Sequence, residues 1–324
     1  MPVKVSVIIP VYKVENYIGR CVRSLMEQTL RDVEFIFVDD ASPDRSMDIV
    51  REITARYKRD VHFLKHAENR GLPSARNTGL RAAQGEFIYH CDSDDWLEPT
   101  MLEKMADAAT RADADFVYCD FYLSFSGSER RMHNPDYESS MEALEKGFLA
   151  GQMKYNVWNK LVKRSLYLDN GIFSPEEHCK GGEDLMMVKV LRCSRKCVHV
   201  PEALYHYNRA NGEAITKTRS KRHFDDIKAN ADDVLDFLSS RPVPHPEFLE
   251  LFKLNIKLPF LMEGDRMHIG LWKQWYPEAN DYIDRNIWLP ARTIRIQKLA
   301  AAGMFLPVRL YAFAVRAFYR IRYR

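Results

Sequence analysis

The sequence has no uninterrupted apolar run of about 20 residues, so it predicts no membrane-spanning helix. It has only six cysteines, scattered along the chain. The pair in "CSRKCVH" has metal-ligand spacing, but no second pair follows at zinc-finger spacing, which argues against a structural zinc. The first residues, "MPVKVSVIIPVY", run directly into a strand pattern without a signal peptide. We therefore expect a reduced, cytoplasmic protein.

The chain also lacks a strong overall charge. Its 48 Lys and Arg residues nearly balance 45 Asp and Glu residues, and the net charge of +3 gives no indication of a nucleic-acid partner. With 46% hydrophobic and 29% charged residues, the composition is typical of a folded protein. No acidic residue follows Asp284, although Arg and Lys continue to the end. The last 40 residues are therefore basic.

Strand and helix patterns alternate through the first 120 residues. Near-continuous apolar runs such as "VSVIIPVY" are typical of strands covered on both faces, and "NYIGRCVRSLMEQ" keeps helical spacing. The expected strands are residues 5–12, 33–40, 61–64, 87–91 and 115–120, and the expected helices are residues 16–28, 42–57, 74–83 and 99–111. This rhythm predicts an α/β fold with a doubly wound, mostly parallel sheet.

The rhythm loosens after residue 120. We expect a helix at residues 141–149, a Gly-Gly turn before "EDLMMVKVLRC", and a strand at residues 197–209. From residue 220 the chain is mostly helical. Helix breaks are expected at residues 241–246 and near Pro259, Pro277, Pro290 and Pro307.

Three carboxylates, Asp92, Asp94 and Asp95, follow the expected strand at residues 87–91. Like charges this close repel one another, and each loses hydration when it is buried. One explanation is a polar turn, with Glu98 and Pro99 opening the next helix. The other is a site for a hard divalent cation, which prefers carboxylate oxygens.

The position of these carboxylates in the expected sheet favours the cation. Ligands of open α/β sheets bind beyond the carboxyl ends of the strands. Asp39 and Asp40 end a second strand at that edge, and Tyr12 ends a third. Acidic groups on two strand ends of one edge are harder to explain as turns.

Five segments, in order, resemble family 2 glycosyltransferases, which have the nucleotide-diphospho-sugar transferase (GT-A) fold. They are "VSVIIPVYKVENYIGRCVRSLMEQTL", "FIFVDDASPDRS", "NRGLPSARNTGLRAAQGEFIYHCDSDDWLEP", "VWNKLVKRS" and "GGEDLMMV". The resemblance covers roughly residues 3–215 and is specific for the family rather than for the sugar. It implies inverting transfer from a nucleoside diphosphate sugar, usually a UDP-sugar, to a hydroxyl of a glycan or lipid-linked acceptor in cell-surface polysaccharide synthesis.

The resemblance also implies a division of the chain. Residues 1–120 would bind the nucleotide sugar, and residues 121–219 would form the acceptor-binding half of the same domain. Residues 220–324 would be a helical extension with a basic amphipathic tail, which adds nothing to the match.

The resemblance assigns nucleotide contacts to Pro10, Tyr12, Asp39, Asn69, Arg76 and Asp92. Tyr12 would stack on the base, unless it is only an aromatic residue at a strand end. Asp39 would accept a base N–H, whereas we interpret Asp40 as a turn residue. Arg76 suits a diphosphate because its guanidinium binds oxyanions in a bidentate manner; the alternative is a solvated helix residue.

The "DSD" segment occupies the place of the family's D-x-D motif. Asp94 would ligate Mn²⁺ or Mg²⁺, and Asp92 would hold the ribose or a metal-bound water. The cation would neutralise the diphosphate leaving group and let the carboxylates lie together. His206 would be a further ligand, although a lone histidine is more often structural. We interpret Asp95 as a helix cap.

The resemblance assigns the acceptor side to "GGED" and its surroundings. Asp184 would be the base that removes a proton from the acceptor hydroxyl, and Glu183 would orient the acceptor. The alternative is that both only cap the following helix. Trp158 and Lys160 would form a wall of the acceptor site, and Arg209 would contact phosphate.

Two other classes remain to be weighed. A nucleotidyltransferase that makes sugar nucleotides should have a glycine-rich loop after the first strand, but "PVYKVENY" contains no glycine. A non-catalytic glycan- or lipid-binding module would need neither carboxylate motif, yet both are present.

The last helix carries aromatic and aliphatic residues beside a basic stripe of Arg309, Arg316 and Arg320. This pattern is typical of a helix that lies in the headgroup region of a membrane, where each basic group contributes about 1 kcal/mol of binding to an anionic leaflet. We expect a peripheral enzyme on the cytoplasmic face. The alternative is that this helix packs on the protein itself or on a second subunit in a homo-oligomer.

Overall fold

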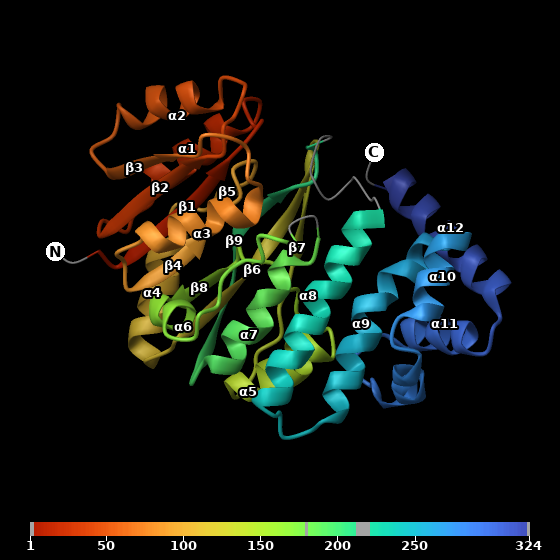
Figure 1. The fold of residues 1–324 in the computed structure, drawn as a ribbon. Coiled ribbons are helices and arrows are strands. Elements are labelled where there is room, and N and C mark those ends of the chain that lie inside the picture. The colour runs from red at the N-terminus through yellow and green to blue at the C-terminus, as the bar shows by residue number, and fades with distance from the viewer. Residues whose placement is uncertain (1–2, 179–180, 212–220, 323–324) are drawn as a thin grey trace. The chain divides into compact units, whose positions relative to one another are not determined.

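A computed structural model of the chain describes residues 3–178, 181–211 and 221–322 (Figure 1). The chain forms two compact units. The first comprises Met1–Ser140 and Tyr155–Val234, and the second comprises Met141–Lys154 and Leu235–Arg324. The division predicted from the sequence, at residues 120 and 219, separates donor-binding, acceptor-binding and helical parts rather than compact units. It stays a prediction.

The first unit is built on one mixed sheet in the order β3-β2-β1-β4-β8-β6-β9-β5, with β7 paired to β6. The strands are β1 (Val5–Val11), β2 (Val33–Asp39), β3 (Asp60–Lys65), β4 (Phe87–His90), β5 (Trp96–Leu97), β6 (Phe116–Phe125), β7 (Ser128–Met132), β8 (Lys160–Lys163) and β9 (Cys197–Asn208). The first four strands pair in parallel, which confirms the predicted α/β architecture. β8 pairs antiparallel with β4 and β6, which the sequence did not indicate.

Helices connect the strands of this unit, as the apolar spacing predicts. They are α1 (Ile18–Met26), α2 (Ser46–Thr54), α3 (Leu72–Ala82), α4 (Met101–Ala112), α5 (Ser140–Glu142), α6 (Arg164–Leu168), η2 (Glu183–Leu185) and α7 (Met186–Cys193), followed by α8 (Lys221–Ser240). The four apolar positions of α1 are buried against the sheet: Ile18, Val22, Leu25 and Met26. Burying each such side chain contributes roughly 1.5–3 kcal/mol.

Helix α3 lies directly on β1 because of a glycine. A Cβ atom at Gly79 would lie 2.4 Å from Cγ2 of Ile8, closer than real carbon contacts allow. Only glycine therefore lets the helix backbone approach the strand this closely. This contact fixes the height of α3 above the sheet, and with it the position of Arg76 on the same helix.

The second unit is helical. Its elements are η1 (Ala143–Leu149), which is a π-helical turn, then α9 (Glu247–Glu263), α10 (Arg266–Gln274), η4 (Pro277–Arg285), α11 (Ala291–Ala301) and α12 (Phe305–Arg322). The expected break near Pro259 is wrong, because α9 continues through that residue. The expected break near Pro307 is confirmed, because α11 ends at Ala301 and α12 begins at Phe305. Pro307 lies within the first turn of α12, where its missing N–H costs nothing. Among the described residues, no helix is both long and apolar enough to cross a membrane.

Candidate active site

The polar residues singled out in the sequence lie at one edge of the sheet. β1, β2 and β4 run parallel, so their carboxyl ends lie side by side. Tyr12 directly follows β1, Asp39 is the last residue of β2, and Asp92 lies two residues beyond β4. This arrangement places the predicted nucleotide and metal residues where open α/β sheets bind ligands.

The predicted nucleobase end combines an open aromatic ring with a nearly buried carboxylate. Pro10 is buried in β1, whereas Tyr12 is 37% exposed. The Asp39 carboxylate accepts a hydrogen bond of 2.8 Å from the Ser42 amide and lies 3.6 Å from the Lys65 ammonium. The Lys13 ammonium lies 5.2 Å from the centre of the partly exposed Tyr12 ring, and stacking on a base stays a prediction.

Asp40 is more than the turn residue that the sequence suggested. Its buried carboxylate accepts hydrogen bonds from the His66 ring, the Asn69 amide group and the backbone amides of Arg70 and Gly71, all at 2.7–2.9 Å. It thereby fixes the loop that leads into α3. Asn69 points at Asp40 here, so a direct contact with the nucleotide stays a prediction.

Arg76 joins the two sides of the site. Its side chain is 2% exposed and comes from α3. One terminal nitrogen donates to Asp184 at 2.8 Å, and the other donates to Asp92 at 3.0 Å. A donor-side carboxylate and the predicted base therefore share one guanidinium, although the two are 92 residues apart in sequence (184 − 92). The sequence identified all three residues but not their contact.

The charges around Asp184 act in opposite directions. Burial raises the pKa of Asp184, Arg76 lowers it, and Glu183 and Asp92 raise it; the net pKa is about 6. The pKa of Arg76 is raised despite its burial, because Asp184 and Asp92 favour the cation. A carboxylate with a pKa of about 6 is ionised at neutral pH and is still basic enough to accept a proton efficiently.

The turn before Asp184 depends on glycine. Gly182 has a φ of 75°, a left-handed conformation that side chains with a Cβ disfavour. It is followed by the short helix η2, which carries Glu183 and Asp184, and then by α7. The Gly-Gly pair thus presents both carboxylates at a helix start, as predicted.

Strand β9 holds the "DSD" segment in place. The Asn211 amide group donates to Asp94 at 2.7 Å, and Asp95 accepts from the Tyr205 hydroxyl at 2.6 Å and from the Asn208 amide at 2.7 Å. The interpretation of Asp95 as a helix cap is therefore wrong. α4 begins at Met101, and Asp95 is 1% exposed beneath the loop.

The electrostatics of this loop suit a cation. Burial and the neighbouring Asp92 raise the pKa of Asp94, and burial raises the pKa of Asp95 well above its usual range. Each ionised group is thus destabilised by desolvation and by its neighbours, and a divalent cation would relieve both effects. Carboxylate oxygens are also the donor set that Mg²⁺ and Mn²⁺ prefer. Asp92 and Asp94 are therefore the residues that would hold the ion.

The three proposed metal ligands do not lie together in this structure. Among residues 3–178, 181–211 and 221–322, the group of His, Asp and Glu atoms close enough to share an ion is Glu34, Asp60 and His62. Those residues lie at the amino ends of β2 and β3, at the opposite edge from Asp92. Glu34 is already occupied by hydrogen bonds from Ser6, Gln84 and Gly85.

His206 is packed as a structural residue. Its ring lies between Trp96 and Tyr122, with centroid distances of 4.9 and 4.8 Å. Its two nitrogens are 2.8 Å from Glu98 and from Glu129. The structure therefore does not bring His206 to Asp92 and Asp94, and its metal role stays a prediction that requires the ring to leave both carboxylates.

The predicted acceptor wall is more buried than expected. Trp158 stacks on Tyr205 at 4.5 Å and is only 6% exposed. The Lys160 ammonium is buried, donates to the Asn156 carbonyl and the Asn159 side chain, and has its pKa lowered to about 7 by burial, which Asp184 partly offsets. Arg209 is exposed, with its guanidinium 5.6 Å from the centre of the Tyr207 ring. These three roles stay predictions.

Sequence reasoning missed Asn77, the neighbour of Arg76. Its side-chain amide donates to the Ser174 carbonyl and to Glu176, both at 2.9 Å, and its carbonyl oxygen accepts from the Ser174 amide. The same helix therefore binds the segment before "GGED" through Asn77 and the predicted base, Asp184, through Arg76. A polar Asn on the buried side of an amphipathic helix was the available signal.

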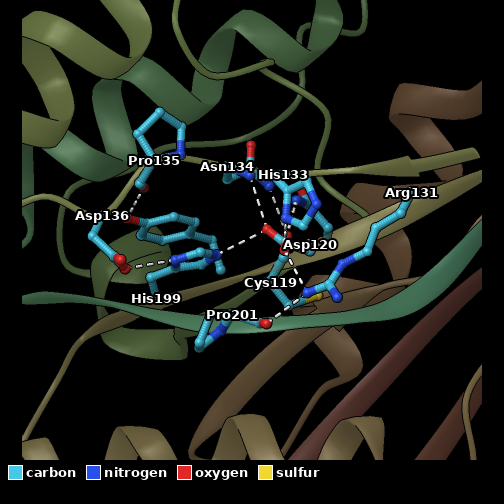
Figure 2. Close-up of polar contacts among 11 residues, drawn as sticks. Cys119, Asp120, Arg131, His133, Asn134, Pro135, Asp136, His199 and Pro201 are labelled. Atoms are coloured by element: carbon cyan, nitrogen blue, oxygen red, sulfur yellow. Dashed lines mark hydrogen bonds and ion pairs between the residues drawn. The ribbon is translucent and has the colours of Figure 1, made fainter.

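A second buried carboxylate, Asp120, was also missed. Figure 2 shows it accepting from the His133 ring at 2.9 Å, the His199 ring at 3.0 Å and the Asn134 amide at 2.8 Å, with Arg131 at 3.1 Å. Burial raises its pKa, but these hydrogen bonds outweigh burial and lower the pKa of Asp120 below its usual range. The cluster ties the β6–β7 hairpin to β9 and is distinct from the Arg76 site.

Comparison with known proteins identifies relatives over most of the chain. Residues 6–176 match the profile described as "Glycosyl transferase family 2". The "Uncharacterized glycosyltransferase EpsJ" of Bacillus subtilis is 32% identical over 231 residues, which is 68% of this chain and 65% of that relative. The match thus spans slightly less than two thirds of the relative's own length.

Two solved structures share the fold over nearly the whole chain. Staphylococcus aureus TarS 1-349 in complex with UDP-GlcNAc has a TM-score of 0.70 and 21% identity, with 97% of this chain and 92% of that chain covered. The mannosyltransferase PcManGT from Pyrobaculum calidifontis, in complex with GDP-Man and Mn²⁺, has a TM-score of 0.52 and 17% identity, with 96% and 83% covered. The GT-A fold with a helical carboxyl-terminal region, predicted from the sequence, is confirmed.

Proposed function

The chain belongs to glycosyl transferase family 2, and from this premise we propose that it transfers a sugar from a nucleoside diphosphate sugar to an acceptor hydroxyl, in a metal-dependent reaction that inverts the anomeric centre. One observation carries the proposal. Arg76 connects Asp92, at the donor edge of the sheet, with Asp184, at the start of η2. By bonding both carboxylates, Arg76 keeps the proposed donor side and acceptor side close together, and a direct displacement between two bound substrates needs this proximity.

In this proposal Asp184 removes the proton from the acceptor hydroxyl. The hydroxyl then attacks the anomeric carbon while the bond to the diphosphate breaks. Arg76 keeps Asp184 ionised and directs it, and Glu183 orients the acceptor beside it. Bound at Asp92 and Asp94, Mg²⁺ or Mn²⁺ would neutralise the diphosphate that leaves.

The donor is proposed to be a UDP-sugar. TarS was solved with UDP-GlcNAc, and that likeness supports a uridine nucleotide at Tyr12 and Asp39. The Asp39 carboxylate accepts a hydrogen bond from the Ser42 amide and, with about four acceptor sites, can also accept an N–H of uracil. PcManGT was solved with GDP-Man and Mn²⁺, which supports the divalent ion and makes a guanine nucleotide the matching alternative in a donor screen.

Substitution of the base tests this assignment. Asp184→Asn should abolish transfer and leave UDP affinity within about twofold of wild type, because the base acts on the acceptor. Transfer is followed by UDP release and UDP affinity by calorimetry. Asp169→Asn, which changes an exposed carboxylate at the end of α6, is the matched control. Loss of UDP affinity in step with rate would place Asp184 in the donor site instead.

We also propose that α12 binds an anionic membrane surface, which would give access to a lipid-linked acceptor of surface polysaccharide synthesis. Val308 and Ala312 pack inward, against the α9 end of the same unit. Leu306, Leu310 and Phe313 lie on another side of the helix and are 68%, 62% and 67% exposed. An outward apolar stripe beside Arg309 supports a helix lying in the headgroup region.

The packing of α12 corrects part of the sequence-based prediction. Arg316 donates to the carbonyl oxygens of Met262 and Glu263 at the end of α9, so it is not free to meet lipid headgroups. The side chain of Arg320 lies outside the described residues. The membrane proposal therefore rests on the apolar stripe more than on the basic one.

Vesicle sedimentation tests the membrane proposal. The protein should pellet with anionic vesicles, and changing Leu306, Leu310 and Phe313 to serine should abolish this without altering donor hydrolysis. Met267→Ser removes an apolar side chain that is 54% exposed from α10 and is the control. Equal sedimentation of all three proteins would refute the proposal. A change of oligomeric state in the triple variant would instead identify a second copy as the partner of this face.

A further inference from the structure

His90 lies directly behind the Arg76 site. It is the last residue of β4, is 3% exposed, and pairs in register with Ile8 of β1. Paired residues of neighbouring strands point to the same side of a sheet, and Ile8 is the residue on which Gly79 of α3 rests. His90 therefore faces α3. The ring of Tyr167, from α6, meets it edge-on at a centroid distance of 6.0 Å.

Both ring nitrogens of His90 lack a hydrogen-bond partner among the residues that the structure describes. The same holds, within that part of the chain, for Nε of Arg76, whose two terminal nitrogens are both occupied. Buried polar atoms are rarely left unpaired, since each such group costs about 1–3 kcal/mol. Arg76 contacts Asp92, which lies two residues after His90, so one explanation can serve both unpaired groups.

The chemistry of the two groups is complementary. A neutral imidazole has one acceptor nitrogen, and the Nε–H of arginine is a donor. A buried water with these two partners would also satisfy both groups when the direct distance is too long.

We propose that His90 is a positioning residue that is linked to Nε–H of Arg76 through one buried water, which accepts from Nε–H and donates to the imidazole. A guanidinium is planar and rigid, so fixing Nε also fixes the directions of the two terminal nitrogens. His90 thereby holds Arg76 in the orientation that reaches Asp184 and Asp92 together. The kinetic consequence rests on the proposed function, whereas the hydrogen bond itself does not.

Nuclear magnetic resonance of protein labelled with ¹⁵N at arginine Nε tests the bond without any substrate. The Arg76 Nε–H signal, assigned through Arg76→Lys, should be protected from exchange in the wild type. It should lose protection in His90→Phe, which keeps a ring but no nitrogen, and keep it in His90→Asn, which restores an acceptor. An Arg76 signal that is identical in wild type and His90→Phe would overturn the proposal.

Should His90→Phe fail to fold, the ring nitrogens of wild-type His90 give the same test. Their ¹⁵N shifts should report a neutral ring with one bonded acceptor, and they should change in Arg76→Lys. Shifts that are indifferent to Arg76→Lys would refute the bond.

Kinetics then separates positioning from stability. His90→Phe should lower kcat for transfer by about tenfold to a hundredfold, with UDP affinity within twofold, because misplacement by about 1 Å can cost this much. His90→Asn should recover most of the rate. Ile88→Val, on the same face of β4, should lower the melting temperature without this loss of kcat. Equal loss in both His90 variants, in step with melting temperature, would reduce His90 to a packing role. A wild type without turnover would instead refute the proposed function, and the resonance test would still stand.

Discussion

Removing the charge of Arg76 should shift the pH dependence of transfer to higher pH. Asp184 must be ionised to act as the base, and its pKa is about 6. The fraction of active base is therefore about one tenth at pH 5 and nearly complete at pH 8. The rate should thus fall about tenfold between pH 7 and pH 5, as the carboxylate is protonated.

Arg76 is the main group that opposes the effect of burial on Asp184. Arg76→Gln leaves the Asp184 carboxylate, whose side chain is 30% exposed, without its counter-ion, so the midpoint of the acid limb should rise by about one pH unit or more. The assay is initial release of UDP between pH 4.5 and pH 8.5 at saturating donor. Arg81→Gln, on the same helix but 56% exposed at its side chain, should leave the midpoint unchanged. A rate that is flat down to pH 5, or a midpoint that falls in Arg76→Gln, would refute the assignment of Asp184 as the base.

Three further substitutions probe the rest of the site and its support. Asp94→Asn should lower turnover by a hundredfold or more, about 3 kcal/mol of transition-state stabilisation, with the melting temperature preserved; a near-normal rate would remove Asp94 from the metal site. Asp40→Asn should weaken UDP binding in calorimetry while kcat changes little, because it loosens the loop before α3; unchanged affinity would make Asp40 purely structural. Asp120→Asn should lower the free energy of unfolding in urea by about 2–3 kcal/mol at pH 7. Folding lowers the pKa of Asp120, so its contribution to the free energy of unfolding is fully present above the ordinary carboxyl pKa. This contribution is lost as the pH falls through the pKa of the folded protein. The difference in unfolding free energy between wild type and Asp120→Asn should therefore shrink near pH 3. Asp107→Asn, which changes an exposed carboxylate on α4 away from this cluster, is the control.

The parallel half of the sheet could be predicted because its signals are local. Continuous apolar runs identified β1, β2 and β4, and helical spacing identified α1. The two-residue strand β5 and the antiparallel position of β8 depend on pairing with distant strands, which no local pattern records. Pro259 was misread for a similar reason. Burial of the apolar face of α9 outweighs the local cost of a proline within it.

The residues of the candidate site were predicted one by one, and their roles stay predictions, whereas the contacts among them could not be predicted. Family resemblance identified Arg76, Asp92 and Asp184 separately. The Arg76 guanidinium binds both the Asp92 and the Asp184 carboxylates because α3 lies close on β1. Gly79 makes this close approach possible. Asp95 illustrates the opposite error. A carboxylate shortly before a helix suggests a helix cap, but in the structure Asp95 is bound by residues of β9.

The most direct test of the account is release of nucleoside diphosphate from a panel of sugar nucleotides by the purified protein. In the presence of Mn²⁺ or Mg²⁺ one donor, expected to be a UDP-sugar, should give slow release by hydrolysis, and EDTA or Asp94→Asn should abolish it. Absence of release with every donor, release that survives EDTA, or pyrophosphate-dependent formation of a nucleoside triphosphate would contradict a metal-dependent glycosyltransferase.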